Sequence, residues 1–277
     1  MQKPFFSIIV VSLNPGERLK GTLESIQKQT FTDIEVILKD GGSSDGSLDE
    51  LEKQGYFDNK THIKVIRKKD CSIYDGMNQA VNCVQGKYVQ FLNCGDYFYS
   101  DTVLEEVAEC IESTKSEKLP MKIYYGNQYN QVQDTIIYSA PKINDFTCFR
   151  NVPCHQVCFY DSRLFQKRAY DLKYKVRADY EHFLYSYYEE GAEGISMPII
   201  VASYEGGGFS ETKENRRKSK EEHKEITQKY LGAAKVFRYR LVMWLTLAPI
   251  RTVIAENSAL SGVYNAIKNG IYRVLRK

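Results

Sequence analysis

The stretch Tyr88-Val89-Gln90-Phe91-Leu92-Asn93-Cys94-Gly95-Asp96 joins an apolar run to a small polar turn that carries one carboxylate. This pattern is typical of a buried parallel strand that delivers a charged group to the open end of a sheet. In open α/β sheets, ligands bind outside the carboxyl ends of the strands. Asp96 is therefore a candidate for holding a divalent cation against a phosphate, whereas Asp101 is expected to cap the next helix.

Strand and helix patterns alternate through the first hundred residues. Apolar runs predict three further strands, at 5–12, 34–38 and 63–66. Apolar residues at helical spacing predict a helix after each of them, at 14–29, near 47–51 and at 74–84. Asn14 is expected to cap the first of these helices. This alternation predicts a parallel sheet with right-handed crossovers.

After residue 101 the pattern is looser, with helix patterns near 104–111 and 178–188. Short apolar runs predict further strands, at least some of them antiparallel, at 123–126, 135–138 and 195–202. The predicted fold class is α/β, with a mixed, mostly parallel sheet flanked by helices and a C-terminal helical extension. The predicted domain organisation is an α/β domain at 1–205, a charged linker or helix at 206–234 and a basic amphipathic helical tail at 235–277.

Composition fits one large α/β domain with an appendage. The chain has 277 residues, of which 43% are hydrophobic and 26% charged, as expected for a protein with a sizeable core. None of the seven cysteines forms a CxxC pair, which favours reduced thiols over disulfides or zinc. Because the N-terminus leads directly into a strand, no signal peptide is expected, and the cytoplasm is the predicted location.

The tail at 235–277 is strongly basic and contains a single acid, Glu256. The apolar run at 241–250 is about half the length needed to span a bilayer, and apolar residues at 260–275 share one helical face. These features favour a helix lying on an anionic membrane surface. The alternative is a pair of helices packed on the domain.

Several motifs in a fixed order resemble family 2 glycosyltransferases of the GT-A fold. They are the first strand with Asn14, the turn Asp40-Gly41-Gly42-Ser43-Ser44-Asp45-Gly46-Ser47, the helix with Asn78, and the strand end Asn93-Cys94-Gly95-Asp96. The resemblance covers roughly residues 5–205. The family usually has two or three acids at that strand end, whereas this chain has Asn93 and Gly95 and keeps Asp96 alone.

The resemblance implies a nucleotide-sugar donor, with UDP-sugar as the expected class. It implies that Asp40 reads the uracil base and that Asp96 ligates Mn²⁺ or Mg²⁺, which stabilises the leaving diphosphate. For Asp40 the alternative is a bond to the amides of its own turn. The other residues expected on the substrate side are Ser12, Asn14, Asp70, Asn78 and Asn93.

Transfer with inversion needs a general base for the acceptor hydroxyl. Asp179, which opens the predicted helix at 178–188, matches the family's base, and Glu181 is the reserve candidate. Asp179 equally fits a first-turn acid that stabilises the helix. His155 and Gln156 resemble a His-Gln pair of related enzymes and are expected to contact the acceptor, the diphosphate or the metal; a structural hydrogen bond is the alternative for His155.

The predicted function is inverting transfer of a sugar to a glycan acceptor, lipid-linked, in bacterial surface polysaccharide synthesis at the inner face of the cell membrane. The alternatives are a nucleotidyltransferase-like protein, which the loop at 13–17 argues against, and a non-catalytic nucleotide-binding module. Nucleic acid is not an expected partner, because the basic residues of the tail cluster with aliphatic residues and not with a stacking platform.

Overall fold

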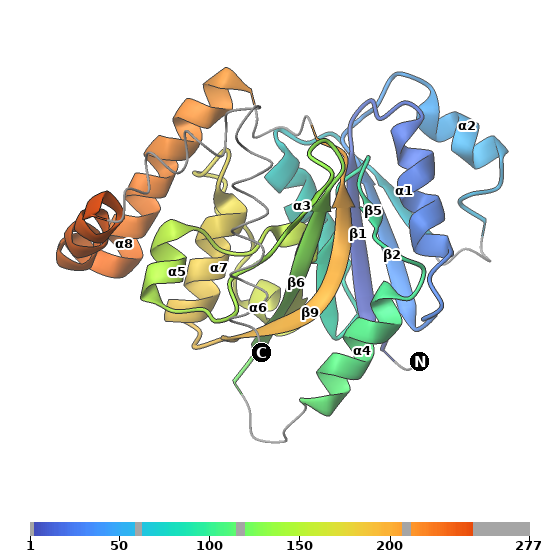
Figure 1. The fold of residues 1–277 in the computed structure, drawn as a ribbon. Helices are drawn as coiled ribbons and strands as arrows, with labels where there is room; N and C mark the ends of the chain where they lie inside the picture. Colours follow the sequence, from blue (N-terminus) through green and yellow to red (C-terminus); the bar gives the residue numbers. More distant parts are fainter. Residues whose placement is uncertain (1–2, 59–62, 115–119, 207–211, 246–277) are drawn as a thin grey trace.

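A computed structural model describes residues 3–58, 63–114, 120–206 and 212–245, and shows a mixed sheet between helices (Figure 1). The strands are β1 (Phe6–Ser12), β2 (Ile34–Asp40), β3 (Ile63–Arg67), β4 (Tyr88–Phe91), β5 (Tyr97–Phe98), β6 (Lys122–Asn130), β7 (Thr135–Ile137), β8 (Cys158–Asp161) and β9 (Glu193–Tyr204). The helices are α1 (Arg18–Gln27), α2 (Ser47–Lys53), α3 (Ile73–Val81), α4 (Val103–Ser113), α5 (Asp145–Arg150), α6 (Ser162–Lys167), α7 (Ala178–Tyr188) and α8 (Lys213–Leu245), with a 3₁₀ turn η1 at His155–Val157.

The strand order is β3-β2-β1-β4-β8-β6-β9-β5, and β7 pairs with β6. The first four strands in this order are parallel, as the alternation predicted. Strand β8 runs antiparallel to β4 and β6, so the sheet is mixed. In the register of β1 and β2, Ser12 lies opposite Asp40. The carboxyl ends of the parallel strands therefore meet at one edge.

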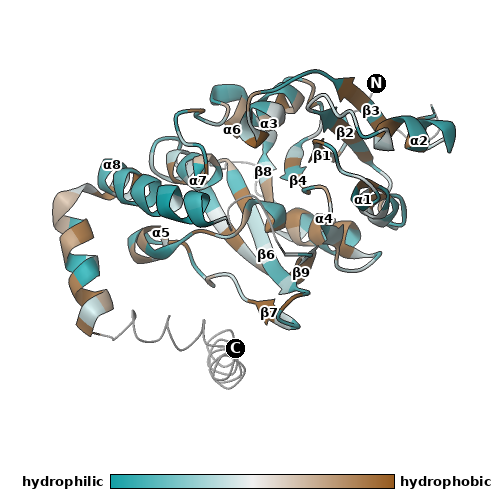
Figure 2. Ribbon diagram, turned by 90° about the horizontal axis from the view of Figure 1, so that it is seen from above, coloured by the Kyte–Doolittle hydropathy of each residue, from teal (hydrophilic) through white to brown (hydrophobic). Residues whose placement is uncertain are grey.

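Helices cover both faces of the sheet, with α1 and α4 on one face and α3, α6 and α7 on the other (Figure 2). Strand β1 is almost wholly buried, as its apolar sequence predicted. The main core includes Leu19 and Leu23 of α1 and Met77 and Ala80 of α3, all less than 2% exposed. The predicted fold class is confirmed.

Two predicted helix caps are wrong. The cap residue of α1 is Glu17, not Asn14, because the helix begins at Arg18 and Asn14, with a φ of +47°, lies four residues before it. The Asn14 side chain instead accepts a hydrogen bond from the Ser44 amide at 2.8 Å and ties the end of β1 to the turn after β2. Helix α4 has Thr102, not Asp101, as its cap residue.

Helix α8 docks on the domain through its first half and bends at Gly232, where φ is 74° and ψ is 161°. Glu222 is 7% exposed and accepts the backbone N–H groups of Lys175, Val176 and Arg177 at 2.8, 3.0 and 2.9 Å. Ile226 is fully buried beside it. From Lys213 onward, the charged segment predicted as a linker or helix is thus a packed helix. The predicted helix at 260–275 lies outside the described residues.

The described part of the chain contains neither a candidate membrane-spanning helix nor a disulfide bond. No helix within it is both long and apolar enough to cross a membrane. All seven cysteines belong to the described ranges, and each is a free thiol.

Candidate active site

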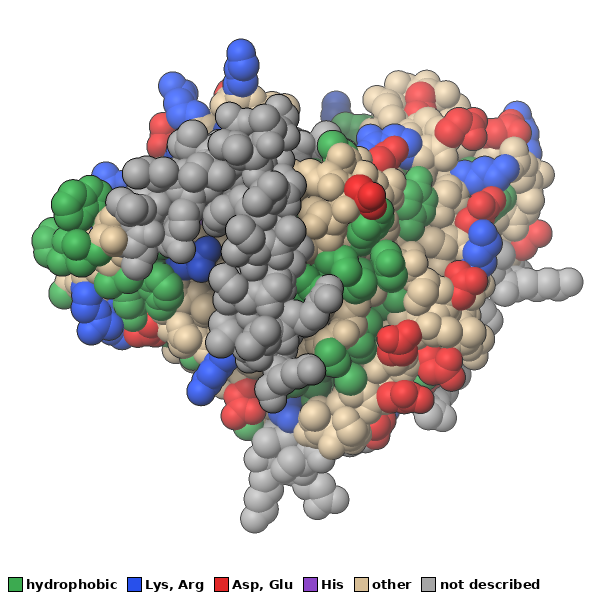
Figure 3. All heavy atoms as spheres, in the orientation of Figure 1, with side chains coloured by type: hydrophobic (Ala, Val, Ile, Leu, Met, Phe, Trp, Pro, Cys, Tyr) green, Lys and Arg blue, Asp and Glu red, His purple; other side chains and the backbone are tan. Residues whose placement is uncertain are grey.

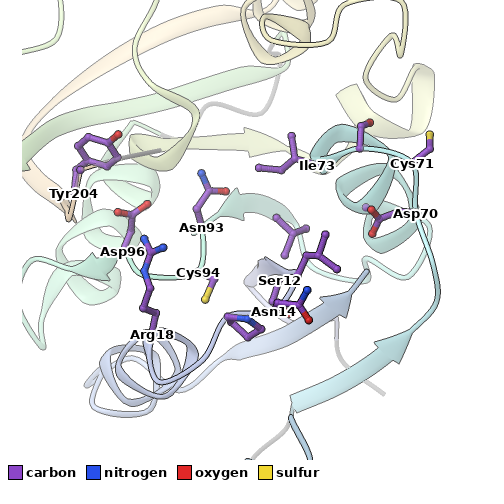
Figure 4. Close-up of a pocket in the computed structure, with 16 residues that line it drawn as sticks. Ser12, Asn14, Arg18, Asp70, Cys71, Ile73, Asn93, Cys94, Asp96 and Tyr204 are labelled. Carbon is purple, nitrogen blue, oxygen red and sulfur yellow. The ribbon is translucent and has the colours of Figure 1, made fainter. Parts of the chain in front are cut away.

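A cavity of about 520 Å³ opens at the carboxyl ends of β1 and β4, where the sequence predicted a site (Figure 4). Its lining includes Ser12 and Asn14 from the end of β1, Asn93 and Asp96 from the turn after β4, and Asp70 ahead of α3. Strand β9 contributes Tyr204 at its end. The volume suits a small-molecule ligand. Five of the predicted site residues are thus brought together.

Two polar atoms in the cavity lining are buried without a partner. The Ser12 hydroxyl and the Asn93 amide oxygen make no hydrogen bond within the described part of the chain. Buried polar groups are hydrogen-bonded in most proteins, because an unpaired one is costly. A ligand that reaches these two atoms would supply the missing hydrogen bonds.

Asp96 is 4% exposed, and both of its carboxylate oxygens have partners. One oxygen accepts a hydrogen bond from the Gln156 side-chain amide, and the other accepts the Glu205 backbone N–H at 3.1 Å. Burial raises the pKa of Asp96 to about 6, because it disfavours the charged form. A cation bound at this carboxylate would favour the charged form and lower the pKa again.

Gln156 positions Asp96 from the 3₁₀ turn η1. It is 2% exposed, its side-chain oxygen accepts a hydrogen bond from Gln128 at 2.9 Å, and its backbone oxygen accepts one from Gln90 at 2.8 Å. These bonds fix the amide and present its N–H to Asp96. Gln156 itself is not among the residues that line the cavity.

A chain of hydrogen bonds runs from Asn93 through His155 to Asp179. The Asn93 amide nitrogen lies 3.1 Å from His155 Nε2, and His155 Nδ1 lies 2.9 Å from Asp179 Oδ2. The Tyr74 hydroxyl donates to Asp179 Oδ1 at 2.9 Å. Burial alone would raise the pKa of Asp179, but the bonds from His155 and Tyr74 outweigh it, and the pKa lies below its usual value. The carboxylate is thus held ionised and oriented.

The reserve candidate Glu181 is enclosed in the core and fully ion-paired. Its side chain is 0% exposed and forms ion pairs with Arg168 at 2.6 Å and Lys229 at 2.8 Å. Burial raises the pKa of Glu181, but hydrogen bonds from Lys229, Tyr230 and Arg168 lower it by more. The pKa therefore lies below its usual value. These contacts make Glu181 a core ion-pair residue and argue against it as the base.

Five of the predicted site residues are not among those that line the cavity. Three of them, His155, Gln156 and Asp179, are described above, and the other two are Asp40 and Asn78. Asp40 Oδ2 accepts the N–H groups of Gly42 and Ser43 at 3.0 Å each, and Oδ1 accepts the Ser43 hydroxyl at 2.5 Å. Asn78 donates to and accepts from the backbone of Tyr170, at 2.9 Å in both bonds. Both side chains use their polar atoms to hold loops, as the turn alternative for Asp40 anticipated.

Asp70, and not Asp40, is the carboxylate that lines the cavity next to the end of β2. Its carboxylate accepts a hydrogen bond from Lys39 Nζ at 2.7 Å, and Lys39 is fully buried. A Cβ on Gly41 would lie 2.8 Å from Asp70 Oδ2, so glycine leaves room for this carboxylate. Lys39, a lysine at the end of a buried strand, is the feature of the sequence that indicates an ion pair with an acid such as Asp70, and the sequence analysis missed it.

The sequence analysis also missed Arg18, which lines the cavity from the first turn of α1. Its Nη2 lies 2.8 Å from Oε2 of Glu205, which follows β9. The two residues are far apart in the sequence, and only the closure of the sheet brings them together. No pattern in the sequence connects them.

Comparison with known proteins assigns the family. The sequence profile described as glycosyl transferase family 2 matches residues 7–172, more than half of the chain. The chain belongs to this family. Proteins named PGL/p-HBAD biosynthesis glycosyltransferase, from Mycobacterium bovis and Mycobacterium tuberculosis, are 34% identical to the transferase over 214 residues. That alignment covers 76% of this chain and 81% of each relative.

Solved structures with the same fold include S. aureus TarS 1–349 in complex with UDP-GlcNAc, with a TM-score of 0.63 and 18% identity, over 82% of this chain and 71% of that one. The transferase spans 37% of the longer TarS structure. The mannosyltransferase PcManGT from Pyrobaculum calidifontis, in complex with GDP-Man and Mn²⁺, has a TM-score of 0.65 and 11% identity, over 97% of this chain and 88% of that one. These likenesses confirm the GT-A fold.

The residues around Asp96 fit a divalent cation that keeps few protein ligands. Asp96 and Asn93 both line the cavity, and the Asp96 carboxylate and the unpartnered Asn93 amide oxygen are hard oxygen donors. Mg²⁺ is commonly held by one or two carboxylates together with substrate phosphates. The described residues contain no cluster of three or more acidic, His or Cys ligands, so substrate oxygens would complete the coordination.

Proposed function

We propose that the transferase moves a sugar, with inversion, from a nucleotide-sugar donor, of the UDP-sugar class, to a hydroxyl group of a glycan acceptor. The observation that carries the proposal is the cavity at the carboxyl ends of β1 and β4. It gathers Ser12, Asp70, Asn93 and Asp96 in a family 2 transferase. The printed donors of the neighbours, UDP-GlcNAc and GDP-Man, favour a nucleotide-sugar.

The donor would lie along the cavity, with its base toward Asp70 and Asn14 and its diphosphate toward Asp96. Asp70 lies beside the turn after β2, at the end of the cavity away from Asp96 (Figure 4). The Ser12 hydroxyl and the Asn93 oxygen lie between these ends and lack protein partners. Asp40 would support the base end indirectly, because it shapes the turn of Gly42 and Ser43.

The bound cation, Mn²⁺ or Mg²⁺, would act as a Lewis acid that stabilises the leaving diphosphate. Asp96, and with it the Asn93 oxygen, would hold it. Gln156 fixes the orientation of the carboxylate, and the Glu205 backbone N–H fixes its second oxygen. This arrangement preorganises the site, so that little rearrangement is needed when charge develops.

Asp179 would take the proton of the acceptor hydroxyl as that oxygen bonds to the sugar carbon and the bond from this carbon to the diphosphate breaks. The hydrogen bonds from His155 and Tyr74 hold Asp179 ionised. His155 connects Asp179 to Asn93 in the cavity. Hydrogen bonds therefore connect the proposed base to the donor site, and this fixed geometry favours in-line attack.

The acceptor would be a lipid-linked glycan, and α8 would bring the transferase to the inner face of the cell membrane. Beyond the bend at Gly232, α8 exposes Phe237, Trp244 and Leu245 at 71%, 68% and 64%. Figure 3 shows hydrophobic side chains gathered over this part of α8, with Lys and Arg beside them. Exposed aromatic and basic groups on one helix suit an interface of anionic lipid.

The test of the transferase proposal is release of nucleoside diphosphate from a panel of UDP- and GDP-sugars, with and without Mn²⁺. Asp96→Ala should abolish metal-dependent release, and the exposed neighbour Asp101→Ala should behave like the wild type. Release that is equal in both variants would contradict the assignment of Asp96. No release from any donor, while nucleotide binding is retained, would favour the non-catalytic alternative.

A further inference from the structure

We propose that Arg18 binds the diphosphate of the donor and that Glu205 holds the guanidinium in place until the donor arrives. This inference rests on the proposed function, since it names a further ligand in the same cavity. It also explains how the negative charge of a diphosphate is balanced beside a turn that carries only one acid. The argument starts from the charges around the cavity.

Arg18 is the only cationic side chain among the described residues that line the cavity. The acids of the lining are Asp70 and Asp96. The charge of Asp70 is balanced by Lys39, which is fully buried at 2.7 Å and does not line the cavity. Asp96 forms no ion pair among the described residues, because its two bonds come from a neutral amide and a backbone N–H, although the Arg18 guanidinium lies beside it (Figure 4). A diphosphate entering this cavity therefore meets one positive group.

The Arg18 side chain has donors to spare. Its Nε and Nη2 both lie 2.8 Å from a single oxygen, Glu205 Oε2. A guanidinium carries five N–H donors in a planar fork that matches phosphate oxygens. The other donors of Arg18 have no partner within the described part of the chain, and the side chain is 53% exposed. Phosphate oxygens can thus bind without first displacing a buried contact.

Gly95 lets Arg18 lie directly across the turn that carries Asp96. A Cβ at this position would lie 2.6 Å from both Arg18 Nη2 and Glu205 Oε2. Gly95 also has a φ of +97°, which disfavours other residues. Figure 4 shows the guanidinium beside the Asp96 carboxylate. The departure from the usual acidic motif thus makes room for a cation, where the family usually has a second acid.

Glu205 is suited to hold Arg18 and then release it. The pair is partly exposed, 53% for Arg18 and 37% for Glu205, and such pairs contribute little stability. A diphosphate offers more negative charge than one carboxylate, so it should compete successfully for the fork. The rival explanation is a purely structural clasp between α1 and the end of β9. The two explanations differ in what happens when each partner is replaced.

The test compares binding of UDP and uridine by calorimetry in wild type, Arg18→Gln, Arg18→Lys and Glu205→Gln, first in EDTA and then with Mn²⁺. GDP and guanosine serve as the second probe pair. Arg18→Gln should weaken UDP binding by about 10- to 100-fold, as expected for a charge-assisted bond, and leave uridine binding within about 2-fold. Arg18→Lys should lie between wild type and Arg18→Gln. Lys28→Gln, an exposed charge at the other end of α1, is the matched control and should bind both ligands like the wild type.

Glu205→Gln separates the two explanations, because it breaks the same pair from the other side. A diphosphate ligand predicts that this variant binds UDP as tightly as the wild type or more tightly. Equal weakening of UDP by Arg18→Gln and Glu205→Gln would overturn the proposal and support the clasp, as would UDP binding unchanged in Arg18→Gln. A wild type that binds neither nucleotides nor nucleosides would overturn both this inference and the proposed donor site.

Discussion

Replacing Glu222 tests whether α8 is part of the folded domain or an appendage. The carboxylate accepts three backbone N–H groups, from Lys175, Val176 and Arg177, at 2.8 to 3.0 Å. In Glu222→Gln the charge is lost and the side-chain NH₂ faces at least one N–H. Because hydrogen bonds to charged groups contribute about 1.5–3 kcal/mol each and neutral ones about 1 kcal/mol, we expect a loss of about 2–3 kcal/mol. Glu222→Ala removes the acceptor of all three N–H groups, of which that of Val176 is buried, and should cost about 3–5 kcal/mol.

The assay is unfolding in urea and by heat. For a domain of this size about 1 kcal/mol corresponds to about 2–4 °C, so Glu222→Gln should lower the melting temperature by about 4–12 °C. Glu221→Gln is the matched control, since its side chain is 67% exposed and its pair with Arg217 is 3.8 Å long; it should change the free energy of unfolding by less than about 0.5 kcal/mol. A Glu222→Gln protein as stable as this control would refute the reasoning and make the first half of α8 a loosely attached segment.

Three further predictions concern acid stability, catalysis and the membrane. His182 is fully buried and burial lowers its pKa to about 4, so its contribution to stability is present above pH 6.5 and is lost as the pH falls toward 4; in a pH series of urea unfolding, His182→Gln should reduce that loss by up to about 3 kcal/mol, and an unchanged slope would contradict the burial argument. Asp179→Asn should lower kcat by about 10²- to 10⁴-fold while UDP binding, measured by calorimetry, is retained; equal activity would exclude Asp179 as the base. In co-sedimentation with anionic vesicles, the Phe237→Glu/Trp244→Glu protein should bind less than the wild type, whereas Val132→Glu, equally exposed at 72%, should not; equal binding by all three would remove the proposed lipid surface.

The sequence predicted the parts of the fold that depend on local pattern. The apolar strands and the α7 helix at Ala178–Tyr188 follow directly from hydrophobic periodicity. The helix caps were less predictable, because the Asn14 side chain can bond either to the start of the following helix or to a neighbouring turn. Its side chain binds Ser44 of a neighbouring turn, and that contact exists only once β1 and β2 are paired.

The candidate site was predictable where residues follow strands, and unpredictable where it depends on closure of the sheet. Ser12, Asn93 and Asp96 end parallel strands or follow them, so their convergence follows from topology. The pair of Arg18 and Glu205 joins the first helix to the ninth strand, and no local rule predicts it. Asp40 is the opposite case. It ends a strand at the predicted edge, but its carboxylate accepts hydrogen bonds from the backbone of its own turn.

The most direct test of the central claim is a crystal structure of the transferase with UDP and Mn²⁺. The account predicts an anomalous peak for manganese beside Asp96 and density for the diphosphate in the cavity near Ser12, Asn93 and Arg18. Nucleotide density at another surface, with this cavity empty at saturating UDP, would contradict it.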